Sequence, residues 1–381
     1  MRSELSSLDV KILAHELNTL LEGARVRNVY QIGDHELKIK LFFPGEGNRD
    51  LIIASNYLCL SSYERSSPSA PTSYAMQLRK HLKGCFIRKV KQADFDRIIE
   101  FVFEGKQCFY LLVAELFGSG NIIFCDKDKK ILGVLEWQKW QHRRIGVGEL
   151  YHYPPAGINP LTLDRGGLDG LIEGSEKNVV SFLASDLNLG GLLGEELCLR
   201  AGIKKQRKIS SLEASELDDL FKLIRGLGDL EGGPVLVSDD EGNPVAALPF
   251  SYRKYEGLRI KKTSSFNQAV DELFSNRDIG EIESRLDKQY EKKKEKLMHI
   301  KKTQEQTIKR LRKQEVDFRR SGDLIYQSMH ELNKLLEMVD EARAKDYSWE
   351  EMNERLSGRV IGSLKILDVK KNGSIILDEL K

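Results

Sequence analysis

The sequence predicts an α+β protein of several domains, and three observations lead to this prediction. Residues 71–103 change from the spacing of an amphipathic helix to the alternation of β-strands. Residues 285–320 are densely charged and contain neither glycine nor proline, which indicates one long exposed helix. A length of 381 residues, with 40% hydrophobic and 31% charged side chains, is typical of two or three domains with ample core.

Residues 71–84 favour a helix, and the two segments that follow favour strands. Gly84 stands where helices commonly end. Cys85 to Val90 and Asp96 to Phe103 then alternate in polarity, as strands do. The apolar positions of the helix are Tyr74, Met76, Leu78 and Leu82. We expect one face of the second strand to carry Ile99, Phe101 and Phe103, and the other Ile98 and Val102.

An Asp-Arg pair, Asp96 and Arg97, stands where the second strand begins. Adjacent residues on a regular strand point to opposite faces, so the two can serve one ligand only at a strand end or a bulge. Alternatively, Arg97 lies along the sheet and pairs with a carboxylate while Asp96 caps a turn. The dipeptide alone favours this alternative, and only its context changes the balance.

Residues 190–203, GGLLGEELCLRAGI, place a glycine-rich turn before a predicted helix and another glycine after it. This pattern resembles a helix-hairpin-helix unit, in which backbone N–H groups at a tight glycine turn hold a phosphate. An ordinary helical hairpin is the alternative. The cations that follow are Lys204, Lys205, Arg207 and Lys208. Residues 233–260 favour strands, which we expect to return to the first domain.

The segment from Arg285 to Arg320 carries fourteen Lys or Arg and six Asp or Glu, a local charge of +8 in a chain of net charge +2. As a helix it would be about 54 Å long at about 1.5 Å per residue. A thin seam of the coiled-coil kind runs along it and needs a partner helix, which dimerisation could supply. A solvated coiled-coil face is the alternative to a phosphate-binding stripe. The seam comprises Leu297, Ile300, Gln304, Thr307, Leu311, Gln314 and Phe318.

The remainder of the chain predicts a small α+β segment. We expect Ser321-Gly322 to interrupt the long helix and a shorter helix to follow from Asp323 to Lys345. Ser348 and Glu351 form a capping-box pattern for a short helix. The final residues predict a hairpin that turns at Asn372-Gly373.

Composition excludes several classes of protein. No stretch approaches about eighteen uninterrupted apolar residues, and the start MRSELSSLDV lacks the apolar run of a signal peptide, so we expect a cytoplasmic protein without membrane contact. The histidines lack metal-ligand spacing, and the turn at residues 118–121 lacks the Lys-Ser or Lys-Thr of a nucleotide loop, so we assign neither a metal nor a cofactor. The cysteines, which we expect to be buried thiols, are Cys59, Cys85, Cys108, Cys125 and Cys198.

Several blocks of sequence resemble one family in content and order. They are SSLDVKILAHELNTLLEGARVRNVYQIG, YAMQLRKHLKG with DFDRIIEF, ELFGSGNIIF, RRIGVGELYHYPP and EELCLRAGI. Their order resembles that of the NFACT family of ribosome-associated quality-control factors, which includes animal NEMF and bacterial RqcH. The older domain name is FbpA, fibronectin-binding protein A-like. The resemblance covers nearly the whole chain, from the N-terminal domain to the middle segment.

The resemblance implies a β-rich N-terminal domain similar to that of formamidopyrimidine-DNA glycosylases, a helix-hairpin-helix domain, and a long basic coiled-coil arm with a small α+β middle segment. The domains that we expect are 1–165 (NFACT-N), 170–230 (helix-hairpin-helix), 231–280 (strands and linker returning to the body), 281–320 (basic coiled-coil helix) and 321–381 (middle segment with helices and terminal hairpin). The family continues into a returning helix and a C-terminal NFACT-R domain, so we expect this chain to be truncated.

The resemblance also implies a function. Such a factor binds the large ribosomal subunit, with its rRNA and stalled peptidyl-tRNA, and recruits aminoacyl-tRNA for C-terminal tailing of the nascent chain, with alanine as the added residue. Peptide-bond formation belongs to the ribosome, so we expect no catalytic residue and no enzyme. The implied tRNA contacts are Asp9, Asp96, Arg97, Arg79 and Lys80. The ribosome and rRNA contacts that we expect are Lys292, Lys293, Lys294, Lys301, Lys302, Lys309, Arg310, Arg312 and Lys313.

Other classes of protein fit less well. A glycosylase of the related fold needs an N-terminal Pro, an adjacent Glu and an Asn in the glycine-rich turn. This chain starts Met1-Arg2-Ser3-Glu4 and has Gly191 at the Asn position, so the second interpretation is a DNA-binding protein of glycosylase-like fold without glycosylase activity. An extracellular adhesin would need an export signal, and a structural coiled coil would bind no RNA. Glu115 and Asn121 match a family block, and the sequence leaves open whether they support the fold or contact RNA.

Overall fold

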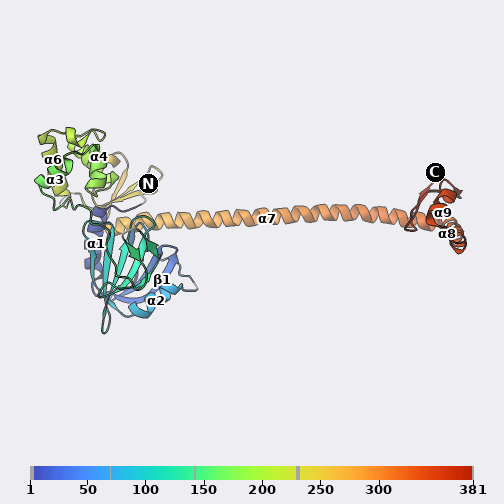
Figure 1. Ribbon diagram of the computed structural model, residues 1–381, viewed down its shortest axis with the longest axis horizontal. Helices are drawn as coiled ribbons and strands as arrows, with labels where there is room; N and C mark the ends of the chain where they lie inside the picture. Colours follow the sequence, from blue (N-terminus) through green and yellow to red (C-terminus); the bar gives the residue numbers. More distant parts are fainter. Residues whose placement is uncertain (1–3, 69, 141–142, 229–231, 380–381) are drawn as a thin grey trace. The chain divides into compact units, whose positions relative to one another are not determined.

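The structure, a computed structural model, describes residues 4–68, 70–140, 143–228 and 232–379, without the side chains of 276–292 and 379 (Figure 1). It divides the chain into two compact units, Met1–Glu283 and Ser284–Lys381. No helix in the described part combines the length and the apolar character that crossing a membrane requires.

A nine-stranded antiparallel sheet forms the larger part of the first unit. Its strand order is β4-β3-β2-β1-β5-β6-β7-β8-β9, and β1 pairs with β5 through a single residue pair, Arg25 with Phe86. The strands are β1 Arg25–Gly33, β2 Glu36–Phe43, β3 Gly47–Ile53, β4 Leu58–Ser61, β5 Phe86–Gln92, β6 Ile98–Glu104, β7 Phe109–Glu115, β8 Asn121–Asp126 and β9 Ile131–Val134. A short hairpin follows, β10 Gln138–Lys139 and β11 Arg144–Ile145.

The alternation predicted for β6 is confirmed. Ile99, Phe101 and Phe103 lie in the main core, whereas Ile98 and Val102 belong to a separate cluster on the opposite face. The strand begins at Ile98 instead of Asp96, so the Asp-Arg pair lies in the turn that precedes it.

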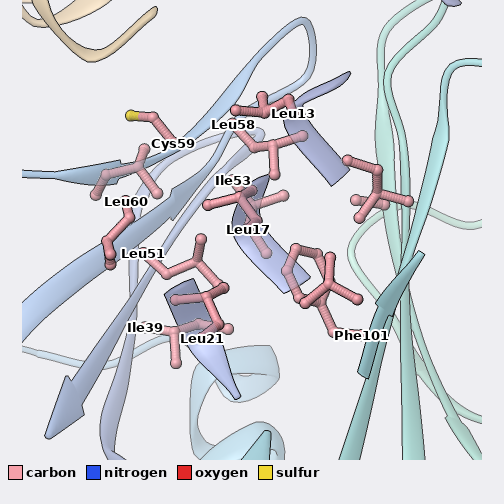
Figure 2. Packing of buried hydrophobic residues seen from close by; sticks show 14 of the residues in the cluster. Leu13, Leu17, Leu21, Ile39, Leu51, Ile53, Leu58, Cys59, Leu60 and Phe101 are labelled. Atoms are coloured by element: carbon pink, nitrogen blue, oxygen red, sulfur yellow. The ribbon is translucent and has the colours of Figure 1, made fainter. Parts of the chain in front are cut away.

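Helix α1 (Ser7–Leu21) supplies the centre of the main core. Leu13, Leu17 and Leu21 are fully buried, and burying each contributes about 1.5–3 kcal/mol. Figure 2 shows these side chains in one cluster with Ile53 and Leu58 of the first four strands and Phe101 of β6, so α1 packs against strands from both parts of the sheet.

Helix α2 (Ser73–Leu82) confirms the predicted helix, and Gly84 after it adopts a φ of 89° that favours glycine. Ala75, Leu78 and Leu82 are its buried residues. Met76, which we expected among the apolar positions, is 53% exposed. It is two residues from Leu78 and therefore lies about 200° away around the helix.

A second core joins short helices to a small sheet in the same unit. Strands β12, β13 and β14 pair with one another, whereas we expected them to return to the first domain. They contact that domain by packing, because Leu236 and Ala247 lie in its core. Val235 and Val237 instead belong to the core of the short helices. The helices are α3 Arg165–Ile172, α4 Val179–Ser181, the π-helical turn Phe182–Asp186, α5 Gly191–Ala201 and α6 Ala214–Arg225, with 3₁₀ turns at Ile209–Ser211, Gly226–Gly228 and Arg253–Tyr255. The strands are β12 Val235–Ser238, β13 Pro244–Leu248 and β14 Arg259–Lys262.

The first turns of α7 (Phe266–Gln327) belong to the first unit and are fixed by polar contacts. The Glu16 carboxylate accepts hydrogen bonds from the N–H groups of Phe266 and Asn267, both at 2.8 Å. The Asn267 side chain accepts from the Leu60 N–H at 2.7 Å and donates to the Leu60 carbonyl at 2.9 Å. Asp271 accepts from the Ser61 hydroxyl at 2.6 Å.

In the second unit, α7 continues to Gln327, so the expected interruption at Ser321-Gly322 is wrong. A single glycine costs a helix interior about 1 kcal/mol relative to alanine, which the intact turns around it can offset, whereas only proline removes a backbone donor. The next helix, α8 (Met329–Ala344), therefore starts after Ser328 and not at Asp323.

The end of the second unit agrees with its sequence. The capping box of Ser348 and Glu351 starts α9 (Trp349–Leu356) as predicted. The hairpin turn at Asn372-Gly373 is also confirmed. The strands are β15 Val360–Ile361, β16 Leu364–Val369 and β17 Ile375–Glu379, and the small core includes Leu335, Val339, Met352, Leu356 and Ile366.

Four of the five cysteines are buried, as expected. Cys108 is exposed, because it lies in the turn between β6 and β7 and not within a strand.

Candidate nucleic-acid site

The turn between β5 and β6 holds Asp96 and Arg97 in one fixed arrangement. The Asp96 carboxylate accepts a 2.7 Å hydrogen bond from the Arg97 N–H. The Gln92 side-chain amide donates to the Asp96 carbonyl at 2.7 Å and to the Ser7 carbonyl at 2.8 Å, which ties the turn to the start of α1. Asp96 therefore caps the turn, in agreement with the alternative that the sequence left open.

The same turn is anchored in the helical part of the unit. Phe95 is 1% exposed and belongs to the core of the short helices. Its carbonyl accepts a 2.6 Å hydrogen bond from the side-chain amide of Asn188, which adopts a φ of 53°. These contacts fix the backbone of Arg97 where the sheet and the helices meet.

The Arg97 side chain pairs with a carboxylate at the surface. Its Nη1 lies 2.7 Å from Glu4 Oε2, and the two side chains are 28% and 60% exposed. Exposed ion pairs of this kind contribute only about 0–1 kcal/mol. The Arg97 guanidinium can therefore exchange Glu4 for a phosphate at little cost.

Arg97 and Glu4 line a cavity of about 470 Å³, which we call the junction pocket. The starts of α1 and α5 also line it, at Ser6 and at Gly190. They lie close together, because a Cβ on Gly190 would be 3.6 Å from the Ser6 Cβ. The N-terminus of α5, which no side chain caps, lies in the wall of this cavity with Arg97, an arrangement that favours an anion. The volume is in the range of small-ligand sites, so one nucleotide is of suitable size.

Asp9 supports this pocket from below the surface. Its carboxylate is fully buried and accepts from the Ser6 N–H at 2.7 Å and the Ser6 hydroxyl at 2.5 Å, which completes the capping box of α1. A buried carboxylate does not reach an external ligand, so we expect Asp9 to act through the position of Ser6.

Arg79 and Lys80 lie away from the junction pocket, because β5 separates the end of α2 from Asp96. The Arg79 Nε donates to the Val29 carbonyl at 2.6 Å, and its guanidinium lies 4.7 Å from the Tyr30 ring centroid. Arg79 is thus partly occupied within the fold, whereas Lys80 is exposed.

The cations that follow α5 are mostly paired. Lys205, Arg207 and Lys208 make ion pairs with glutamates, and Lys204 is exposed. The cations that line the pocket with the glycine turn are therefore Arg97 and Lys254. The basic residues that follow α5 in the sequence do not line it.

The predicted arm contacts are spread along α7 in the second unit. The exposed ones are Lys293, Lys294, Lys301, Lys302, Lys309, Arg310, Arg312 and Lys313. The side chain of Lys292 lies outside the described residues. Leu297, Ile300, Leu311 and Phe318 of the seam are 43–73% exposed.

Glu115 and Asn121 support the fold. Both are 2% exposed. Glu115 accepts from Arg143 and, at 2.8 Å, from the Tyr151 hydroxyl, and burial with this contact raises the pKa of Tyr151. The Asn121 side chain bonds both backbone groups of Glu136. Together they hold the hairpin of β10 and β11.

No local pattern pointed to Glu4 or Asn188, because the partner of each lies about ninety positions away. The glycine turn could be predicted as an anion-binding feature. Its position beside the start of α1 could not.

Comparisons with known proteins agree with this architecture. Residues 6–357 match the family of NFACT N-terminal and middle domains. An archaeal Rqc2 homolog, aRqcH of Methanocaldococcus jannaschii, is 32% identical over 361 residues, which cover 91% of this chain and 53% of that protein. The ribosome quality control complex subunit NEMF of Mus musculus is 26% identical over 381 residues, 92% of this chain and 36% of its own length. The chain thus spans about half or less of these relatives.

Solved structures share the fold. The fibrinogen binding protein from Staphylococcus aureus matches with a TM-score of 0.58 and 20% identity over 70% of this chain and 97% of that one. The N-terminal part of the fibronectin/fibrinogen-binding protein from Streptococcus suis matches with a TM-score of 0.56 and 23% identity over 72% and 100%. The extent of the family match, with the archaeal relative, establishes that this chain belongs to the NFACT family and comprises its N-terminal and middle domains.

Proposed function

We propose that this chain is the RNA-binding part of a ribosome-associated quality-control factor. It binds tRNA at the junction pocket and the rRNA of the large subunit, with its stalled peptidyl-tRNA, along the arm. It recruits aminoacyl-tRNA so that the ribosome extends the nascent chain, with alanine as the added residue. The factor acts in the cytoplasm, has no catalytic residue of its own and requires no cofactor.

Arg97 at the junction pocket is the observation that carries this proposal. The backbone of Arg97 is fixed, and its guanidinium pairs with Glu4, which a phosphate can replace. The guanidinium also lines the same pocket as two helix N-termini. A folded RNA offers phosphates in a defined geometry, and such a site selects that geometry. The relatives support the same class of partner, since they are named as ribosome quality control complex subunits.

The arm supports the second half of the proposal. The eight predicted cations whose side chains are described are all exposed, and Lys301 lies 4.0 Å from the Glu305 carboxylate, a weak pairing. Such cations neutralise phosphates without requiring a fixed geometry, so they provide affinity that depends on salt.

Sequencing of RNA crosslinked to the full-length protein in cells tests the proposal. We expect tRNA and large-subunit rRNA to be enriched above total RNA. Arg97→Ala should remove the tRNA and keep the rRNA, whereas Arg144→Ala, which breaks an exposed ion pair with Glu149, should keep both. An absence of tRNA enrichment with the unaltered protein would refute the proposal.

A further inference from the structure

One row of cross-strand neighbours crosses the end of the nine-stranded sheet. Arg25 of β1 is opposite Phe42 of β2 on one side and Phe86 of β5 on the other. Phe86 is in turn opposite Glu104 of β6, and Glu104 is opposite Phe109 of β7. Residues opposite each other on paired strands share one face, so these five side chains lie side by side. We call this set the Phe-Arg row.

Two of the three phenyl rings of the Phe-Arg row, those of Phe86 and Phe109, face outward. Phe86 is 39% exposed and Phe109 is 47% exposed, whereas their neighbours on the other face, Ile87 and Phe103, are fully buried. Phenylalanine is usually among the buried residues, and two exposed rings in one row are a feature that the core does not require.

Arginines lie beside two phenyl rings of the row, those of Phe42 and Phe86. The Arg27 guanidinium lies 4.4 Å from the Phe42 ring centroid, and those of Arg25 and Arg88 lie 5.9 and 5.6 Å from the Phe86 centroid. Arg88 also pairs with Glu104. Within the described residues, neither Arg25 nor Arg27 makes an ion pair with a carboxylate.

The end of α2 extends this positive surface. A Cβ on Gly84 would lie 3.6 Å from Arg25 Nη2, so the turn after α2 borders the row. Lys80 and Lys83 near this turn are exposed. The surface therefore combines exposed aromatic faces with an excess of cations, and a neutral protein partner would leave that charge without a counterpart.

We propose that the Phe-Arg row binds single-stranded RNA. Unpaired bases stack on Phe86 and Phe109, and Arg25, Arg27 and Arg88 contact the phosphates between them. Aromatic rings interleaved with cations on an open sheet are the arrangement that holds unpaired bases, since every base has a face that can stack. The row lies at the first residue of β5 and the Asp-Arg turn follows its last, about 20 Å along the strand at about 3.3 Å per residue, so the two are separate contacts.

Binding of a fluorescein-labelled ten-nucleotide oligouridine, followed by fluorescence anisotropy with this chain, tests the proposal. The double variant Phe86→Ala/Phe109→Ala should bind at least about tenfold more weakly, because stacking contributes about 1–3 kcal/mol per base. Phe86→Tyr/Phe109→Tyr should retain binding within about threefold, because a tyrosine ring stacks as well. Trp140→Ala removes another exposed aromatic ring, outside the row, and should leave binding unchanged.

Two outcomes would overturn the proposal. The first is oligouridine affinity within about twofold of the unaltered chain for a double alanine variant whose melting temperature is unchanged. If the double variant does not fold, crosslinking of a 4-thiouridine oligomer to the unaltered chain decides, and crosslinks confined to peptides without Phe86 or Phe109 are the second. Arg97→Ala separates this surface from the junction pocket, since it should abolish tRNA capture and leave oligouridine binding intact.

Discussion

The junction pocket and the arm present cations in opposite ways. Arg97 belongs to a turn that hydrogen bonds from Gln92 and Asn188 hold to two different parts of the first unit. The lysines of the arm between Lys293 and Lys313 are exposed along one helix, and Lys301 pairs only weakly with Glu305. An arginine whose backbone is fixed offers its guanidinium from one place and so selects a geometry, whereas exposed ammonium groups only add their charges. Selectivity should therefore depend on the first region and affinity on the second.

The largest expected effect is the loss of selectivity when the Asp-Arg turn is substituted. In the complete protein, Asp96→Ala or Arg97→Ala should abolish tRNA recruitment and leave binding of the large subunit intact, because the arm is unchanged. Tailing of a stalled nascent chain on purified large subunits, with co-purified tRNA quantified, measures both. Normal recruitment by either variant would show that the turn does not contact tRNA.

The next largest effect is the loss of affinity when the cations of the arm are substituted. A sixfold glutamine variant of the arm should bind the large subunit about ten- to a hundredfold more weakly at physiological salt, and its log–log salt dependence should be less steep by up to about 0.7–0.9 per lost phosphate contact. The substituted residues are Lys301, Lys302, Lys309, Arg310, Arg312 and Lys313. Preference for tRNA over other RNA should not change.

Glu305→Gln is the control for the arm, because it removes an acidic neighbour of Lys301 and should strengthen binding slightly. An unchanged salt dependence in the sixfold variant would mean that the arm does not neutralise phosphates.

A smaller effect on stability and on tRNA affinity is expected from Asp9, which caps α1 beside the junction pocket. Asp9→Ala should lower the free energy of unfolding by about 1–2 kcal/mol, because it removes the capping box of α1, and should weaken tRNA binding several-fold by displacing Ser6. Urea denaturation and tRNA affinity measure the two effects. Glu351→Ala removes the equivalent carboxylate of α9 in the second unit and should leave tRNA binding unchanged. Equal tRNA losses in both variants would exclude the route through Ser6.

Glu4→Gln should change the free energy of unfolding by less than about 0.5 kcal/mol, since the pair with Arg97 is exposed. The affinity for tRNA should rise about two- to threefold, because Arg97 loses a competing carboxylate. Anisotropy with labelled tRNA measures this, and a marked loss of affinity would instead make Glu4 part of the binding surface.

The smallest effect concerns Glu195, which occupies two lysines of the helical part. Hydrogen bonds from Lys205 and Lys254 hold the pKa of Glu195 below its ordinary value of 4.5. A lowered pKa stabilises the folded state above the unfolded value and loses this contribution as the pH falls through the folded value. Glu195→Gln should therefore cost less than about 0.5 kcal/mol at pH 7, and this cost should be smaller at pH 3, as denaturation at both values can show.

The sequence could predict those features that depend on neighbouring residues. The alternation of β6, the capping box at Ser348 and the turn at Asn372-Gly373 each follow from a few adjacent side chains, and all are confirmed. The interruption predicted at Ser321-Gly322 was wrong, because the low helix propensity of these two residues costs less than the surrounding helix contributes.

The candidate site was predictable only in part. Asp96 and Arg97 could be singled out, and the glycine turn could be recognised as an anion-binding feature. Their meeting with Ser6 could not, because it depends on how α1 and α5 pack, and no short segment encodes that. The exposed rings of Phe86 and Phe109 were missed for the same reason, since only the strand register places them in one row.

The carboxamide of Asn267 has a practical consequence for anyone who shortens this protein. It occupies the backbone groups of Leu60 on the outermost strand, β4, much as another strand would. A fragment that stops before Phe266 would leave those groups available to a second molecule and should self-associate through them. A fragment that retains residues up to Ser275 keeps the Asn267 side chain on Leu60 and should remain monomeric, so the start of α7 is the wrong place to cut.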